Sequence, residues 1–211
     1  MITRLQISII LGISAIYWAG ALCVLGLPVS KELYTPFGLV LTALTITASL
    51  FNTYIWKWPL INGWVIKQPK LSGTWKIVLH SDWVDPATNK TIDPIAGYLI
   101  IRQTFTHLSV KMVTTESGSE SMSSKFKSED DGTFKLISVY RNIPKAKVRG
   151  RSEIHHGTLI LSIATADNKI EGEYWTDRKS KGSIELTAKN DNICNSFDEA
   201  EKMFSKTTKK D

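Results

Sequence analysis

The chain has 211 residues, a formal net charge of +6 and a pI near 9.2, so it is long enough for one or two domains. Of its two cysteines, Cys23 lies in a long apolar run and Cys194 in the polar C-terminal tail, so neither a disulfide nor a cysteine zinc site is expected. The positive charge favours either anionic lipid headgroups or an anionic ligand as partner. The positions of the charged residues along the chain distinguish between these two kinds of partner.

Two long uncharged runs open the chain, at residues 5–27 and 37–56. Both reach the roughly 20 residues that a helix needs to cross a bilayer. The first run is too long for the apolar part of a signal peptide. Leu22 also stands where a lipoprotein signal has a small residue before its cysteine. The pattern therefore predicts a two-helix transmembrane hairpin over 1–66.

The basic residues near these runs predict an orientation. Arg4 precedes the first run, and Lys57 follows the second, whereas the connecting loop holds only Lys31, offset by Glu32. Because Lys and Arg gather on the cytoplasmic side of a membrane, both ends of the hairpin are expected there. The predicted location is the bacterial inner membrane, two-pass, with the N-terminus and the rest of the chain in the cytoplasm.

From Leu71 the hydrophobic period becomes two, which is typical of strands. Turn signals recur at strand-length intervals: DPATNKTIDP, FTH, ESGSE, SEDDG, NIPKAKVRGRSEIHH, ADNK and TDRKSKG. Seven connections predict eight strands, and closure would remove exposed edges. The expected fold is a membrane-anchored all-β protein, with an eight-stranded antiparallel up-and-down β-barrel over 67–190. Residues 191–211 form a polar tail with a short helix at 196–204 and a disordered end.

Connections in an up-and-down barrel alternate between its two ends, and the charges divide in the same way. One end would hold Glu129, Asp130, Asp131 and Asp167. The other would hold the basic segments KAKVRGR and TDRKSKG, on the side away from the predicted membrane helices. This distribution does not suit a headgroup-binding patch. It favours an opening that attracts an anion.

Strand alternation predicts what lies beneath that opening. Tyr174 and Thr176 share the inward face of one strand, with Arg178 at its rim, and Tyr140 and Asn142 share the inward face of another. The fourth predicted strand places small hydroxyl groups inward, those of Ser119, Ser121 and Ser123. An eight-stranded barrel can hold one small ligand, and this interior is polar and aromatic toward one end.

Catalytic motifs are absent from the sequence: there is no nucleophile elbow, HExxH or phosphate-binding loop. His155 and His156 are interpreted as a solvated pair in a turn. KAKVRGR is as typical of a solvated loop as of a site. The sequence therefore favours a binding protein over an enzyme, without a cofactor or metal.

Several motifs follow one another in a distinctive order: two uncharged segments, LSGTWK, Gly97-x-Leu99-x-Ile101-x-Gln103, the alternating serines, YRNIP, His155-x-Gly157 and GEYWTDRKSKGSIEL. This arrangement resembles the two-transmembrane β-barrel effectors of CBASS, the bacterial cyclic-oligonucleotide anti-phage signalling systems. The likeness spans nearly the whole chain. Each motif alone is weakly specific.

The resemblance implies a CBASS effector whose barrel binds a cyclic dinucleotide made by a cognate nucleotidyltransferase during phage infection. Helix assembly into a homo-oligomer would then disrupt the inner membrane, through contact with its lipids, and kill the cell. No DNA or RNA polymer is expected as partner. The candidate ligand-binding residues are Tyr140, Asn142, Arg149, Arg151, Tyr174, Thr176, Arg178 and Lys181, with Gln103, Ser121 and Ser123 as weaker candidates for base edges or ribose.

Two other functions remain open at this point. A membrane-anchored lipocalin-like barrel would carry a lipid or another small apolar ligand, and it predicts a wholly apolar interior. A structural or partner-docking domain would have a filled barrel and would use the long connection after Asn142 as its contact surface.

Overall fold

The computed structural model describes residues 4–26, 37–62, 66–84, 89–163 and 170–207. The chain divides into two compact units, Met1–Ile61 and Asn62–Asp211. The first unit is helical and the second is built around a β-barrel.

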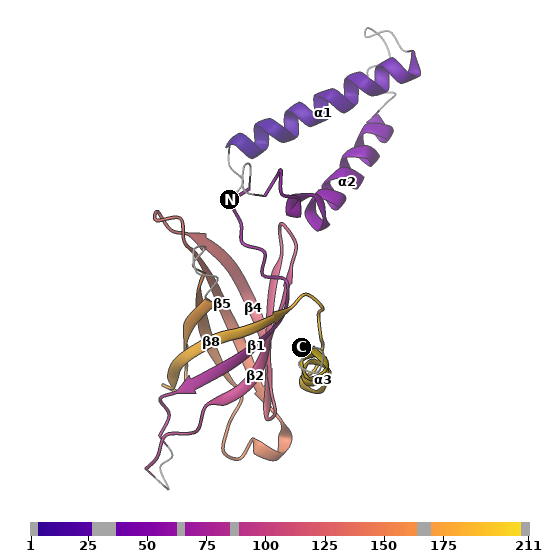
Figure 1. The fold of residues 1–211 in the computed structure, drawn as a ribbon. Coiled ribbons are helices and arrows are strands. Elements are labelled where there is room, and N and C mark those ends of the chain that lie inside the picture. Colours follow the sequence, from indigo (N-terminus) through magenta and orange to yellow (C-terminus); the bar gives the residue numbers. More distant parts are fainter. Residues whose placement is uncertain (1–3, 27–36, 63–65, 85–88, 164–169, 208–211) are drawn as a thin grey trace. The chain divides into compact units, whose positions relative to one another are not determined.

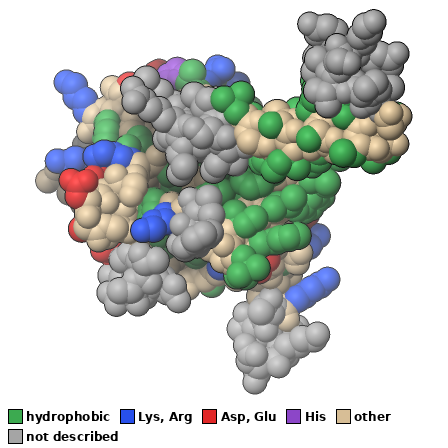
Figure 2. Space-filling view, turned by 90° about the horizontal axis from the view of Figure 1, so that it is seen from above, with side chains coloured by type: hydrophobic (Ala, Val, Ile, Leu, Met, Phe, Trp, Pro, Cys, Tyr) green, Lys and Arg blue, Asp and Glu red, His purple; other side chains and the backbone are tan. Residues whose placement is uncertain are grey.

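The first unit contains helices α1 (Arg4–Leu25) and α2 (Phe37–Thr53), followed by the 3-10 turn η1 (Ile55–Lys57). The hydroxyl groups of Tyr17 and Thr47 lie 2.7 Å apart and join the two helices by a hydrogen bond. Many apolar side chains of these helices are exposed, and Figure 2 shows hydrophobic side chains gathered on one part of the surface. Neither helix has a charged residue after Arg4.

The predicted transmembrane hairpin is not found. The uncharged run 37–56 does not form a single helix, because α2 ends at Thr53 and the chain turns into η1. Of the helices in the described ranges, none combines the length and apolar character that a bilayer crossing requires. The prediction of a two-pass inner-membrane protein with a cytoplasmic barrel is therefore wrong.

The predicted eight-stranded antiparallel β-barrel is confirmed, and Figure 1 shows its strands curving around one interior. The strands are β1 (Gly73–Ser81), β2 (Ile95–Gln103), β3 (Leu108–Thr114), β4 (Ser117–Ser128), β5 (Phe134–Pro144), β6 (His155–Ile163), β7 (Ile170–Thr176) and β8 (Lys181–Asn190). Each strand pairs with its neighbours in sequence, and β8 closes the barrel on β1. Up-and-down order places successive connections at alternate ends, as predicted.

Alternation along the strands places one set of side chains in the barrel interior. Its deepest members are fully buried, among them Ile77, Leu99, Leu136, Leu161 and Ile184. Burial of aliphatic side chains at about 25 cal/mol per Å² is the main force that holds the barrel closed. This core fills the middle of the barrel, so any ligand site has to lie toward one end.

A second apolar cluster lies outside the barrel, beneath the C-terminal helix α3 (Phe197–Thr207). Tyr98 of β2 points outward, and its ring packs on Phe197 and Phe204 at centroid distances of 5.3 and 5.5 Å. Cys194 is buried in the same cluster. The expected short helix is present, but it extends to Thr207, into residues predicted to be disordered.

Candidate functional site

One end of the barrel gathers most of the polar groups that point inward. Four connections lie at this end: β1–β2, β3–β4, β5–β6 and β7–β8. Buried polar side chains lie just beneath them: Thr114, Ser119, Asn142, His155 and Thr176. We call this end of the barrel the polar end. The opposite end holds Glu129, Asp130 and Asp131 in the β4–β5 connection, whereas Asp167 lies outside the described residues.

Two tyrosines lie beneath these polar groups, each beside a glycine of the neighbouring strand. Tyr140 of β5 pairs with Gly157 of β6, and Tyr174 of β7 pairs with Gly182 of β8. A Cβ atom on Gly157 would lie 2.5 Å from the Tyr140 ring, and one on Gly182 would lie 2.9 Å from the Tyr174 ring. The glycines therefore leave the space that lets both rings lie across the barrel interior.

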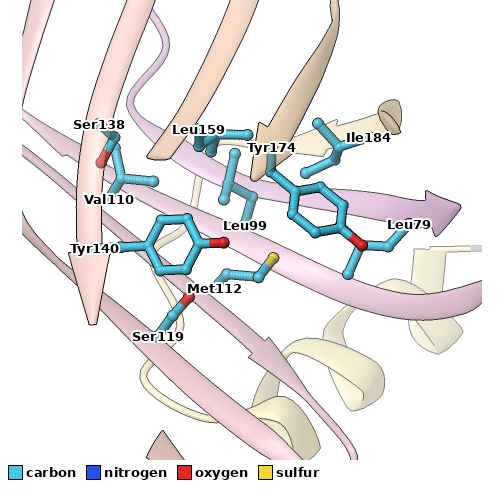
Figure 3. Close-up of a pocket in the computed structure, with 10 residues that line it drawn as sticks. All are labelled: Leu79, Leu99, Val110, Met112, Ser119, Ser138, Tyr140, Leu159, Tyr174 and Ile184. Carbon is cyan, nitrogen blue, oxygen red and sulfur yellow. The ribbon is translucent and has the colours of Figure 1, made fainter. Parts of the chain in front are cut away.

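A small cavity separates the two rings. Its volume is about 20 Å³, room for roughly one water molecule. Figure 3 shows Tyr140 and Tyr174 among the residues around it, which are Leu79, Leu99, Val110, Met112, Ser119, Ser138, Leu159 and Ile184. The inward serines were expected to leave a roomy cup. The rings and Met112 fill that space instead.

Both phenols stay uncharged at neutral pH. Burial, with a smaller contribution from Tyr174, raises the pKa of Tyr140 to about 12. Burial also raises the pKa of Tyr174, although its hydrogen bond with Ser81 opposes the shift. The two hydroxyls can therefore donate and accept hydrogen bonds at the polar end without adding negative charge.

His155 was interpreted as a solvated residue, but it begins β6 and its side chain is only 7% exposed. Its Nδ1 lies 2.9 Å from the backbone oxygen of Glu153, which can only accept, so Nδ1 carries the proton and Nε2 is the acceptor. Burial, together with the charge of Arg178, lowers the pKa of His155. Asn142 is its cross-strand partner and is also buried. Asn142 was predicted as a ligand-binding residue, whereas His155 was not, and together they add donors and acceptors at the polar end.

The predicted cations surround the polar end but do not converge on one point. Arg178 donates to the Ser152 hydroxyl at 3.2 Å and so joins the β7–β8 and β5–β6 connections. Arg149 donates to the Pro144 carbonyl, and Arg151 is paired with Glu116. Arg178 is therefore the predicted cation most directly linked to the interior, since its charge also acts on Tyr140.

Lys181 lies on the outer side of the barrel. It begins β8 next to the inward Gly182, pairs with the exposed Trp175, and is exposed itself. Lys181 was expected at the rim of the opening. It does lie at the polar end. Its side chain belongs to the outer face by strand alternation.

A β-bulge corrects the prediction for the serines of β4. Pairing with β5 shifts register between Ser121 and Ser123, so Met122 is the extra residue. Ser123 is therefore exposed and pairs with the outward Val139, and Ser124 takes the inward position. Ser121 accepts a hydrogen bond from the backbone of Val110 at 2.9 Å.

Gln103 lies at the opposite end of the barrel. Its side-chain oxygen accepts from the Leu71 backbone, and its amide nitrogen donates to the Pro69 carbonyl. Both halves of the amide thus hold the segment that enters β1. Gln103 is separated from Tyr140 and Tyr174 by the apolar core, and in this structure it supports the fold.

The chemistry of the polar end suits recognition of a flat, polar and anionic molecule. Two neutral phenols, a histidine acceptor, an amide and hydroxyls lie beneath cations. In the described ranges no group of three His, Cys, Asp or Glu residues is placed to hold a metal ion. Neutral donors with nearby arginine and lysine are the groups that bind phosphate and base edges.

The chain matches a known protein family. The family of the Cap15 cyclic dinucleotide receptor domain matches residues 66–188, which is more than half of the chain and includes all eight strands apart from the end of β8. A search of curated proteins finds no match.

Proposed function

The chain belongs to the family of the Cap15 cyclic dinucleotide receptor domain, and we propose that it binds its cyclic dinucleotide at the polar end of the barrel. Tyr140 and Tyr174 would stack on the bases, while Arg178 would bind a phosphate. The observation that carries this proposal is the placement of two neutral phenols beneath buried Asn142 and His155, next to a cationic rim. Arginine suits phosphate because its planar fork can bind two oxygens.

Binding requires a change in the polar end. Ligand sites for molecules of this size usually measure roughly 300–1,000 Å³, far more than the cavity of about 20 Å³. Rotation of the Tyr140 and Tyr174 rings, with movement of the flexible Met112, would open the space that they now occupy. The tyrosines would then change from filling the barrel to flanking the ligand.

Family membership makes the chain a CBASS effector that binds a cyclic dinucleotide. We extend this to a ligand-induced homo-oligomer that kills the phage-infected cell, with the ligand supplied by a cognate nucleotidyltransferase. Exposed apolar side chains on α1 and α2 support self-association, since large exposed apolar surfaces mark interaction sites. The ligand must bind the assembled state more tightly than the resting state to shift this equilibrium. This proposal does not include disruption of the inner membrane, because the described helices provide no membrane span.

The lipid-carrier alternative is disfavoured by the polar interior. An apolar ligand could not form hydrogen bonds with Asn142 or with the Nε2 acceptor of His155, and covering these polar groups would be costly. A lipocalin-like carrier would place aliphatic side chains at these positions.

Calorimetric titration of the full chain with cyclic dinucleotides that contain every combination of two bases tests the proposal. We expect at least one to bind. Arg178→Ala should weaken that binding by about 1.5–3 kcal/mol, the usual cost of a charged hydrogen bond. Tyr140→Phe should retain the stacking surface and lose only the hydroxyl contact.

The matched control is Arg102→Ala. Arg102 donates to the Asn195 side chain on the outside of the barrel, and its loss should leave affinity unchanged. Failure of every cyclic dinucleotide to bind would reject the proposed function. Equal effects of the two arginine substitutions would place the site elsewhere.

A further inference from the structure

The outer face of the barrel carries an ordered charge pattern across β4 to β8. Strand register aligns outward side chains in rows that cross the sheet. The row through the middle of this face is Lys125, Ile137, Ile160, Glu173 and Ser183. It passes from a cation through two isoleucines to an anion.

The row toward the opposite end repeats the order of charges, and the row toward the polar end does not. Toward the opposite end of the barrel, Lys135 of β5 shares its row with Glu171 of β7 and Glu185 of β8. Toward the polar end, Val139 of β5 shares its row with Trp175 of β7 and Lys181 of β8, so this row is apolar and ends in a cation. In its middle row and in the row toward the opposite end, the face therefore has a basic side on β4 and β5 and an acidic side on β7 and β8.

This face is also accessible and hollowed. Val139 is 43% and Trp175 is 46% exposed. A hollow of about 460 Å³ runs from Lys135 past Ile160 to Glu173 and Glu185. In contrast, the outward apolar residues of β2 and β3 are packed beneath α3, which Figure 1 shows beside β1 and β2.

We propose that this face binds the same face of a second copy of the chain, around a two-fold axis that runs parallel to β6. Such an axis exchanges left and right across the strands, so the Lys125–Lys135 side of each copy meets the Glu173–Glu185 side of the other. Ile160 lies on the central strand, close to the axis. The inference deepens the proposed function, because it names a surface for the oligomer.

The charge order selects this arrangement over its alternative. A two-fold axis across the strands would place Lys125 against Lys125 and Glu173 against Glu173, and juxtaposed like charges reject a partner. Part of the basic charge is already paired within the chain, since Nζ of Lys135 lies 3.2 Å from Oε1 of Glu129. An axis along β6 keeps both barrels pointing the same way. The two polar ends of the pair would therefore open on one side.

Charge exchange in the full chain tests the surface. The acidic variant carries Lys125→Glu with Lys135→Glu, and the basic variant carries Glu173→Lys with Glu185→Lys. We expect each variant to lose self-association at this face by at least tenfold, because like charges then meet on both sides. Mixing the two, with different affinity tags, should restore co-purification, because every pair across the axis is again opposite. Lys202→Glu with Lys206→Glu on α3 matches the charge change of the acidic variant and should have no effect.

Crosslinking locates the axis independently of any association through α1 and α2. In a chain with Cys23→Ala and Cys194→Ala, Ile160→Cys should form a disulfide-linked dimer under mild oxidation. Lys76→Cys, on the outer side of β1, should remain monomeric. Absence of the Ile160→Cys dimer, or variants that associate like the unmodified chain, would overturn the proposal.

Titration with the same cyclic dinucleotides separates the two proposals. The charge-exchange substitutions lie outside the barrel, so each variant should still bind the ligand, and its affinity should fall only by the coupling between binding and assembly. If no cyclic dinucleotide binds any variant while charge exchange behaves as expected, the proposed function fails and the docking surface stands. If ligand binds and charge exchange has no effect, the docking surface alone is wrong.

Discussion

The His155 ring is buried at the polar end, and its lowered pKa makes the stability of the barrel depend on pH. Its ordinary pKa is 6.5, and the folded value lies below this. Between the two values the unfolded chain binds the proton and the folded chain does not. The stabilisation is therefore present above about pH 6.5 and declines as the pH falls toward the folded pKa. We expect the midpoint temperature of thermal unfolding to decrease as the pH is lowered from about 7.5 to about 5.5.

Two substitutions separate His155 from the other histidines. His155→Gln removes the titration and should flatten this part of the pH profile. His107→Gln, in an exposed connection at the opposite end, should retain it. Asp177 titrates outside this window, because its hydrogen bond from the His156 backbone lowers its pKa below the ordinary acidic value. A His155→Gln profile as steep as that of the unmodified chain would contradict the assignment.

At the level of residues, the alternation of inward and outward side chains along a strand predicted some positions correctly. It failed where a β-bulge interrupts the alternation. Tyr140, Asn142 and Thr176 face inward as predicted, because β5 and β7 keep an unbroken alternation. Ser123 faces outward because of the bulge at Met122, which nothing in the serine-rich sequence marks. Whether the inward residues bind ligand remains a prediction. His155 was missed because the first residue of a strand cannot be separated from the preceding turn by composition.

The pairing of each tyrosine with a glycine is the element-scale feature that shapes the site. We expect Gly157→Ala to destabilise the chain by about 1–3 kcal/mol, as overpacking does. The new Cβ would lie 2.5 Å from the Tyr140 ring and 2.6 Å from the Trp175 carbonyl oxygen. Replacing glycine by alanine in a strand would otherwise be favourable, so the sign of the change reports the contact. Chemical denaturation measures it.

Gly118→Ala is the control for this experiment. Gly118 lies in β4, and the nearest atom to its Cβ would be the Met112 carbonyl oxygen at 4.0 Å. This substitution should be neutral or slightly stabilising. A Gly157→Ala chain as stable as the Gly118→Ala chain would mean that the Tyr140 ring does not occupy the space above Gly157.

At the scale of elements, the sequence was most informative for the strands. Period-two patterns bounded by seven turn signals specified eight strands, and closure was expected because it removes exposed strand edges. Helix ends were less predictable. An uncharged run does not mark where a helix stops, so the end of α2 at Thr53 could not be read from 37–56. The extension of α3 depends on Phe204 packing on Tyr98, a contact between segments distant in sequence.

At the scale of the whole molecule, the candidate site could be placed at one end but its present volume could not be predicted. The count of inward small and large residues suggested a cup. The observed cavity is small because the Tyr140 and Tyr174 rings lie across the interior, beside Met112. Ring orientation is set by packing among residues from all eight strands, which no single strand pattern contains. The placement of charged connections does not have this limit, because the order of the strands alone decides at which end of the barrel each connection lies.

The charge difference between the two ends should control how fast the ligand arrives. Lys145 and Lys147 lie exposed in the β5–β6 connection at the polar end, whereas the β4–β5 connection at the opposite end is acidic. Lys145→Glu with Lys147→Glu should slow association of a bound cyclic dinucleotide by about tenfold at low salt, with little change in dissociation. The difference should shrink near 0.15 M salt, where screening acts over roughly 8 Å. Stopped-flow measurements across salt concentrations follow both rates. Lys202→Glu with Lys206→Glu gives the same net charge away from the polar end. If it slows association equally, net charge rather than the polar end attracts the ligand.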